Sequence, residues 1–193
     1  MQKKLSQLSS MVSGYNFRHS VENESNGDIC VVQGKNIVIN QDILETKDLV
    51  SVSTQAPRAP YFLQRNDVLL VSRGLDSGTF RSAVYITENK KVIASSSVQI
   101  IRIADVSVLP KFVSLYLNSP EGQKKLLQIA TGGSYIKTIL IKNLNDLKIP
   151  IPPMHTQKLL INLYENILDQ EKIMDRKKEI QQNIIKTTFN NLK

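Results

Sequence analysis

The sequence contains a single cysteine, Cys30, and no long run of apolar residues. One cysteine excludes a disulfide within the chain and a metal site built from several thiolates. A membrane-spanning helix needs about 18 or more consecutive apolar residues, and no segment approaches that length. The N-terminus also lacks the apolar core of a signal peptide. The sequence therefore predicts a cytoplasmic protein with no membrane partner.

The common enzyme motifs are missing as well. The sequence has no phosphate-binding loop of the Walker type, no G-x-G-x-x-G and no G-x-S-x-G. His19 and His155 stand alone in the sequence, without neighbours that could complete a metal or catalytic set, so we expect ordinary surface histidines. These absences predict a non-catalytic protein with no metal site and no cofactor.

One pattern leaves an enzymatic alternative open. Asp76 followed by Glu88-x-Lys90 resembles the carboxylate pair and lysine with which many nucleases hold magnesium at a phosphodiester. The alternative function is therefore a magnesium-dependent nuclease that uses Asp76, Glu88 and Lys90. Glu45-x-Lys47 is a second Glu-x-Lys match, and residues 88–91 are also typical of a polar hairpin turn, which we favour.

Proline and glycine are both absent from Thr156 to the C-terminus. A continuous helix over those 38 residues would be about 57 Å long, with Thr156 as its N-cap. The preceding segment, Leu147–Pro153, carries three prolines, which favours an edge strand or an extended connector. We therefore expect a globular domain at residues 1–153 and a long helix at residues 154–193.

The apolar residues of this helix leave two interpretations open. Leu160, Leu163 and Ile167 follow a helical spacing, but Lys177 and Gln181 interrupt the heptad seam that these residues begin. Either the helix packs along its own domain, or it pairs with a helix of another chain, in an antiparallel arrangement. For the second case, the predicted dimerisation residues are Ile173, Ile180, Ile184 and Phe189.

The remaining pattern predicts an α+β fold. Residues 66–72 form the best strand of the chain, and further strands are expected at residues 28–32, 36–39, 83–87, 92–95 and 98–103. Residues 3–12 predict a short helix or a lead-in segment. Two more helices are expected from Leu109-Pro110 to Leu117 and from Ser119-Pro120 to about Ala130, each with proline at its first position.

Positive charge concentrates in the globular part. The net charge is +8, and the segment from Thr156 contributes seven basic and five acidic residues, which leaves +6 on the preceding part. This balance favours an anionic partner, nucleic acid first. The predicted DNA-binding residues lie in three loops: Tyr15 and Arg18; Arg73, Ser77, Thr79 and Arg81; and Gly133, Ser134, Tyr135 and Lys137. Arginine can reach guanine or phosphate, while exposed N–H groups, hydroxyls and lysine suit phosphate oxygens.

Several short motifs together resemble the specificity subunits of Type I restriction–modification systems. They are Ser13-Gly14-Tyr15-x-Phe17-Arg18, Asp67-Val68-Leu69-Leu70-x-Ser72-Arg73-x-x-x-x-Gly78, Tyr116-Leu117-x-Ser119-x-x-Gly122, Gly132-x-Ser134-x-x-Lys137-x-Ile139, and Leu144-x-x-Leu147-x-Ile149-Pro150-x-Pro152-x-x-x-x-Gln157. The last motif, followed by a long helix, is the most specific. The resemblance spans nearly the whole chain.

The resemblance implies a target recognition domain at residues 1–153, which reads one half of a bipartite site in double-stranded DNA, mainly in the major groove. It implies a spacer helix at residues 154–193 that docks the DNA methyltransferase subunit, within a complex that also contains a restriction subunit. Such subunits carry no catalytic activity of their own. They usually have two recognition domains and two spacer helices, whereas this sequence shows one of each. That difference predicts a half-length subunit that forms a homodimer through antiparallel pairing of its terminal helices.

Overall fold

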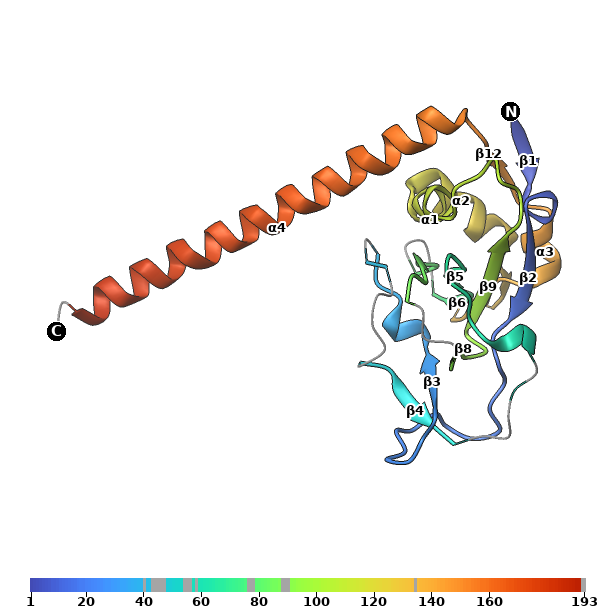
Figure 1. Cartoon of the computed structure of the whole chain (residues 1–193), viewed down its shortest axis with the longest axis horizontal. Coiled ribbons are helices and arrows are strands. Elements are labelled where there is room, and N and C mark those ends of the chain that lie inside the picture. Colours follow the sequence, from blue (N-terminus) through green and yellow to red (C-terminus); the bar gives the residue numbers. More distant parts are fainter. Residues whose placement is uncertain are drawn as a thin grey trace. The chain divides into compact units, whose positions relative to one another are not determined.

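A computed structural model describes residues 1–39, 41–42, 48–53, 57, 59–75, 79–87, 91–133 and 135–191. The chain divides into two compact units, Met1–Gln157 and Lys158–Lys193. The first unit contains every strand and all helices except most of the last one (Figure 1). Among the described residues, no helix is both long enough and apolar enough to cross a membrane. The predicted α+β fold with a long C-terminal helix is confirmed.

A four-stranded antiparallel sheet forms the centre of the first unit. Its strands, in spatial order, are β2 (Ser9–Ser13), β9 (Val98–Ile103), β5 (Val68–Val71) and β7 (Ser82–Val84). Strand β5 is buried on both faces, because Val68 and Leu70 belong to one apolar cluster and Leu69 and Val71 to another. This explains why the strand reads as an uninterrupted apolar run rather than an alternating pattern.

Two helices cover one face of this sheet. They are α1 (Pro110–Asn118) and α2 (Pro120–Ile129), both with proline in the first turn as predicted. Ser119 begins α2, because its hydroxyl oxygen accepts the N–H of Gly122 at 3.1 Å. Asn118 closes the outer edge of β7: its side-chain oxygen accepts the N–H of Ser82 at 2.8 Å, and its amide donates to the Ser82 carbonyl at 2.9 Å.

A second, three-stranded sheet packs toward the opposite face. It contains β4 (Val50–Val52), β3 (Ile29–Val32) and β8 (Val92–Ala94), with β3 and β8 parallel (Figure 1). Val32, Val92 and Ala94 share a buried cluster with Leu69 and Val71 of β5, so the two sheets have a common core. A salt bridge between Asp67 and Arg102 borders this layer, with both guanidinium–carboxylate hydrogen bonds at 2.8 Å.

The proline segment forms an edge strand, as the sequence predicted. Strand β12 (Lys148–Pro150) pairs antiparallel with β1 (Gln2–Lys4), after the short helix α3 (Ile141–Asn145). The long helix α4 (Met154–Asn191) follows. It starts two residues before the predicted N-cap, because the carbonyl of Pro153 already accepts the N–H groups of Thr156 and Gln157. The expectation that Thr156 caps the helix was therefore wrong.

Two other local predictions were wrong. Residues 3–12 were expected to form a short helix or a lead-in segment, but they contain the end of β1, the 3₁₀ turn η1 (Leu5–Gln7) and most of β2. Residues 36–39 were expected to form a strand, but Asn36 ends the 3₁₀ turn η2 (Gly34–Asn36) and residues 37–39 lie outside any strand. In the first case the cause is tertiary: β1 and β2 pair with β12 and β9, which lie far along the chain.

Candidate nucleic-acid interface

Two of the predicted DNA-binding loops meet in a small three-stranded ribbon. Its strands, in spatial order, are β10 (Thr131–Gly132), β11 (Lys137–Thr138) and β6 (Arg73–Gly74). Arg73 lies opposite Thr138, and Gly74 lies opposite Lys137. Because adjacent residues of a strand point to opposite faces, Arg73 and Lys137 project from opposite faces of the ribbon. A ribbon that enters a groove of DNA can therefore carry a cation toward each wall of the groove.

The base of this ribbon is fixed by Ser72. This buried residue donates its N–H and its hydroxyl to the carbonyl of Ser97, at 2.8 and 3.0 Å, and its own carbonyl accepts the N–H of Ile139 at 2.8 Å. Ser72 thus joins the end of β5 to the start of the ribbon. Gly74 leaves room for the Thr79 side chain, which occupies the space that a Cβ would need. The motif around Ser72 and Arg73 therefore positions the ribbon.

Large apolar side chains are exposed at the tip of this ribbon. Tyr135 is 85% exposed, and both Ile136 and Leu75 are 60% exposed. Gly133 also lies in the turn between β10 and β11, where a Cβ would meet no other atom within 4 Å. Exposed apolar side chains that gather in one place mark contact surfaces, so this tip is a candidate contact surface. Leu75 and Ile136 were not among the predicted site residues, although both are apolar residues within otherwise polar loops.

Among the described residues, the cationic side chains of the ribbon are unpaired, whereas other cationic side chains of this unit form ion pairs that stabilise the fold. Arg102 is paired with Asp67, whose hydrogen bond raises the pKa of Arg102 although burial opposes it. Lys111 contacts Asp42, and Lys3 contacts Asp105 at 2.8 Å. By contrast, the side chains of Arg73 and Lys137 form no ion pair or hydrogen bond within the part of the chain that the structure describes. Their charges remain available for an anionic partner.

Unlike Arg73, Arg81 uses its guanidinium within the fold. Its guanidinium donates to the carbonyl of Gly34 at 3.2 Å, and its Nε is buried without a hydrogen-bond partner among the described atoms. The backbone carbonyl of Arg81 also accepts the N–H of Val71 at 2.8 Å, beside the start of the ribbon. Arg81 is therefore tied to the interior, whereas Arg73 is exposed.

Tyr15 and Arg18 lie at a second candidate contact surface on the same unit, outside the ribbon. The backbone of Tyr15 bridges to Ser95, and the preceding Gly14 lies so close that a Cβ there would overlap the Ser95 carbonyl. The Tyr15 ring packs edge-on against Phe17 and Tyr61, with ring centroids 4.9 and 5.5 Å apart. The motif around Gly14 therefore fixes an aromatic cluster against the second sheet.

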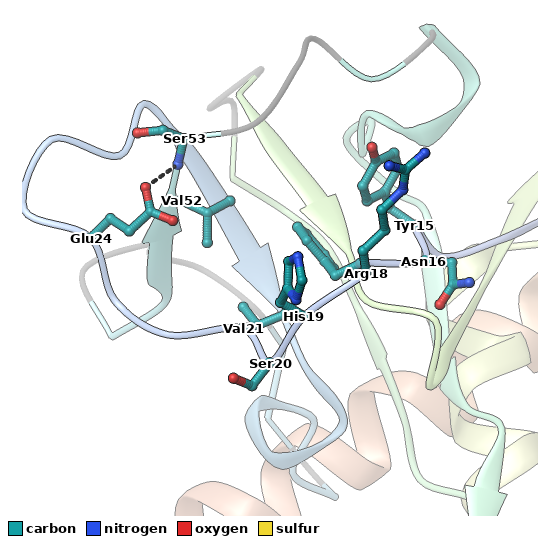
Figure 2. Close-up of a pocket in the computed structure, with 10 residues that line it drawn as sticks. Tyr15, Asn16, Arg18, His19, Ser20, Val21, Glu24, Val52 and Ser53 are labelled. Atoms are coloured by element: carbon teal, nitrogen blue, oxygen red, sulfur yellow. Dashed lines mark hydrogen bonds between the residues drawn. The ribbon is translucent and has the colours of Figure 1, made fainter.

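An open cleft of about 410 Å³ lies beside this aromatic cluster. Figure 2 shows Tyr15 and Arg18 at one end of the cleft and Glu24, hydrogen-bonded to the N–H of Ser53 at 2.9 Å, at the other. Arg18 and His19 are exposed, and the Arg18 side chain has no ion pair among the described residues. The cleft thus offers an aromatic surface and a cation that is not engaged by the fold.

Several predicted site residues lie outside the described residues. These are Ser77 and Ser134 of the predicted DNA-binding set, and Asp76, Glu88 and Lys90 of the nuclease alternative. Within the described ranges, no group of three or more His, Cys, Asp or Glu side chains is placed to hold a metal ion.

The predicted dimerisation residues lie on α4, in the second unit. Ile173, Ile180, Ile184 and Phe189 are all exposed there, as are Ile167, Met174 and Ile185. This helix therefore carries a series of exposed apolar side chains.

Comparison with known proteins identifies one family for most of the chain. The sequence model described as "Type I restriction modification DNA specificity domain" matches residues 1–182. No curated protein sequence matches the chain.

Three solved structures share the fold. The first is the HsdS subunit from Thermoanaerobacter tengcongensis, with a TM-score of 0.61, 19% identity, and coverage of 91% of this chain and 39% of that chain. The second comes from work on complex assembly and conformational transition of the type I R-M system, with a TM-score of 0.65, 19% identity, and coverage of 91% and 40%. The third is the S subunit of a Type-I restriction-modification system from M. genitalium, with a TM-score of 0.56, 17% identity, and coverage of 88% and 39%. The chain thus spans about 40% of the length of these structures.

Proposed function

The chain belongs to the Type I restriction modification DNA specificity domain family, and on this premise we propose that residues 1–153 are a target recognition domain. The family consists of non-catalytic DNA-recognition subunits, as the motifs implied, which argues against the nuclease alternative. The proposed domain reads one half of a bipartite site in double-stranded DNA, in the major groove. The major groove, which presents a distinct pattern for each base pair, admits two paired strands such as β10 and β11.

The observation that carries this proposal is the ribbon formed by β6, β10 and β11. It joins two loops that are about 60 residues apart and presents two cations that the described fold leaves unpaired. In this proposal Arg73 reads a base edge and Lys137 contacts a phosphate. In the same proposal Thr79, Gly133 and Tyr135 contact the DNA backbone or the groove, while the predicted contacts of Ser77 and Ser134 fall outside the described residues.

The other predicted DNA-binding residues are proposed to have different roles. Arg18 and Tyr15 provide a second contact with the DNA, through the cation and aromatic surface of their cleft. Arg81 acts mainly within the fold, because its guanidinium already donates to the carbonyl of Gly34 and its own carbonyl accepts the N–H of Val71. This ranking assigns the base-reading role to Arg73 rather than to Arg81.

The helix at residues 154–193 is proposed to serve as the spacer. Its exposed apolar side chains support pairing with a second copy as an antiparallel coiled coil, so that a homodimer presents two recognition domains. The same assembly would dock the DNA methyltransferase subunit, and through it the restriction subunit. One of the three similar structures comes from work on complex assembly of the type I R-M system, which supports this proposal by analogy.

The test is DNA affinity measured by fluorescence anisotropy over a range of salt concentrations. Duplexes enriched from a randomised library serve as the probe, with the chain alone and with the co-expressed methyltransferase subunit. Arg73→Ala should cost about 1–3 kcal/mol on the enriched duplex and relax the preference at one position. Lys137→Ala should weaken binding to all duplexes alike and reduce the salt slope by about one.

Lys124→Ala is the matched control, because Lys124 is an exposed lysine on α2 without an ion pair in the described structure. It should change neither affinity nor salt slope. If Arg73→Ala, Lys137→Ala and the double variant all behave like Lys124→Ala, the DNA does not bind the ribbon.

A further inference from the structure

Charged residues in the middle of α4 differ in whether they have an ion-pair partner within the helix. Asp169 and Lys172 form an ion pair at 3.1 Å, and Arg176 and Glu179 form another at 2.6 Å, both within the helix. Because successive helical residues are rotated by about 100°, these four lie on the side away from Ile167 and Met174. They form a solvent-facing side whose charges are already satisfied.

Glu171 and Lys178 lie on the other side of the helix. They occupy the same angular position, two turns apart, and flank the stripe that contains Ile167 and Met174. Neither side chain has an ion pair or hydrogen bond within the described part of the chain. At this angular position the helix therefore presents an unpaired carboxylate and an unpaired ammonium beside an exposed apolar stripe, which includes Met174 at 63% exposure.

We propose that two copies of α4 pair antiparallel in one register, in which Glu171 of each copy faces the partner's Lys178. This inference rests on the homodimer of the proposed function and specifies its geometry. In an antiparallel pair, residues at nearly equal distances on either side of the centre, close to Asp175, face each other around a two-fold axis. Three such pairs in the stripe are alike (Ile167 and Ile184, Gln170 and Gln181, Ile173 and Ile180), and Glu171 and Lys178 are opposite in charge.

This register also accounts for the polar residues that interrupt the heptad seam. With Ile167 opposite the partner's Ile184, Gln170 falls opposite the partner's Gln181, so amide meets amide. Lys177 falls opposite the partner's Met174, where its stem can cover the thioether while its ammonium reaches water. On the side of the stripe that carries Glu171 and Lys178, Tyr164 falls near the partner's Ile185. On the opposite side of the stripe, Ile173 falls near the partner's Ile180.

Alternative registers are disfavoured by the same two charges. A shift by one heptad in one direction sets Glu171 against the partner's Glu171, and a shift in the other direction sets Lys178 against the partner's Lys178. Parallel pairing would set Lys177 against the partner's Lys177 in the seam. Like charges at these distances repel, so the antiparallel register is specified by charge as well as by apolar contact.

The test measures the dimer dissociation constant of the full chain by sedimentation equilibrium at low salt. The wild-type chain should form a species of about twice 21.8 kDa. Glu171→Lys and Lys178→Glu should each weaken the dimer about tenfold or more, because each replaces two symmetric attractions by two repulsions. An equimolar mixture of the two variants should restore wild-type affinity, since the altered charges then face their opposites.

Asp169→Lys and Lys172→Glu are the matched controls, because they make the same charge changes on the solvent-facing side. Both should stay within about twofold of the wild-type dissociation constant. If the chain dimerises but Glu171→Lys behaves like Asp169→Lys, or the mixture stays as weak as the single variants, the register is wrong while the homodimer stands. A wild-type chain that remains monomeric at tens of micromolar removes both the homodimer and its register.

Discussion

Replacing Gln157 by leucine tests how the first turn of α4 is attached to the recognition unit. The Gln157 side chain is fully buried and makes three hydrogen bonds to backbone groups. Its oxygen accepts the N–H of Leu109 at 2.9 Å, and its amide donates to the carbonyls of Ser107 and Pro152 at 2.8 and 2.9 Å. Leucine has a similar volume but can replace none of these bonds.

The size of the effect follows from the number of groups left without a partner. A buried hydrogen bond contributes a net stabilisation of about 1 kcal/mol, and an orphaned buried group costs about 1–3 kcal/mol. Three lost bonds therefore predict a loss of about 3 kcal/mol or more. For a chain of this length, about 2–4 °C of Tm is lost per kcal/mol, so Gln157→Leu should lower Tm by about 6–12 °C.

The assay is thermal unfolding followed by circular dichroism at one fixed protein concentration, since dimerisation makes Tm depend on concentration. Gln128→Leu makes the same substitution at an exposed position of α2 and should change Tm by less than about 2 °C. Gln157→Glu is a second variant that keeps the shape and the acceptor. Burial among two carbonyls would raise the pKa of the new carboxyl, so this variant should regain stability as the pH falls and the carboxyl becomes protonated.

The result that would refute this reasoning is a Gln157→Leu variant that melts within about 2 °C of the wild type. Such a result would mean that water or a shifted backbone satisfies the three groups. The presence of glutamine at the end of the last family motif would then not be explained by these three hydrogen bonds.

Two further predictions concern the core of the recognition unit. Gly14→Ala should destabilise the fold by about 1–3 kcal/mol in urea unfolding, because its Cβ would overlap the Ser95 carbonyl, whereas Gly133→Ala, in open space, should be nearly neutral. Burial raises the pKa of Tyr85 to about 12, with the charges of Cys30 and Asp67 adding to the effect. Since the fold favours the protonated phenol, its contribution is complete below pH 10 and is lost toward pH 12, so Tyr85→Phe should lose less stability over that interval; equal losses would contradict the assignment.

Elements whose hydrogen bonds and apolar contacts are local could be predicted from the sequence. The long helix follows from the absence of proline and glycine after Pro153, and α1 and α2 follow from proline at the first helical position. Strand β5 follows from four consecutive apolar residues, which need burial on both faces. The short motifs of the sequence also predicted the family to which the chain belongs. The structure shows that Gly14, Ser72 and Gln157 in those motifs occupy positions where few other residues would fit.

Tertiary structure decided the elements whose partners are distant in the chain. Residues 3–12 have a helical spacing of apolar residues, but strand pairing with β12 and β9 satisfies their backbone and buries Leu5 and Leu8. Likewise, nothing local shows that Arg73 lies beside Lys137, or that Arg81 turns inward to Gly34. A helix forms its hydrogen bonds within one segment, so a local pattern can predict it, whereas a strand or a ribbon depends on a partner that folding must bring to it.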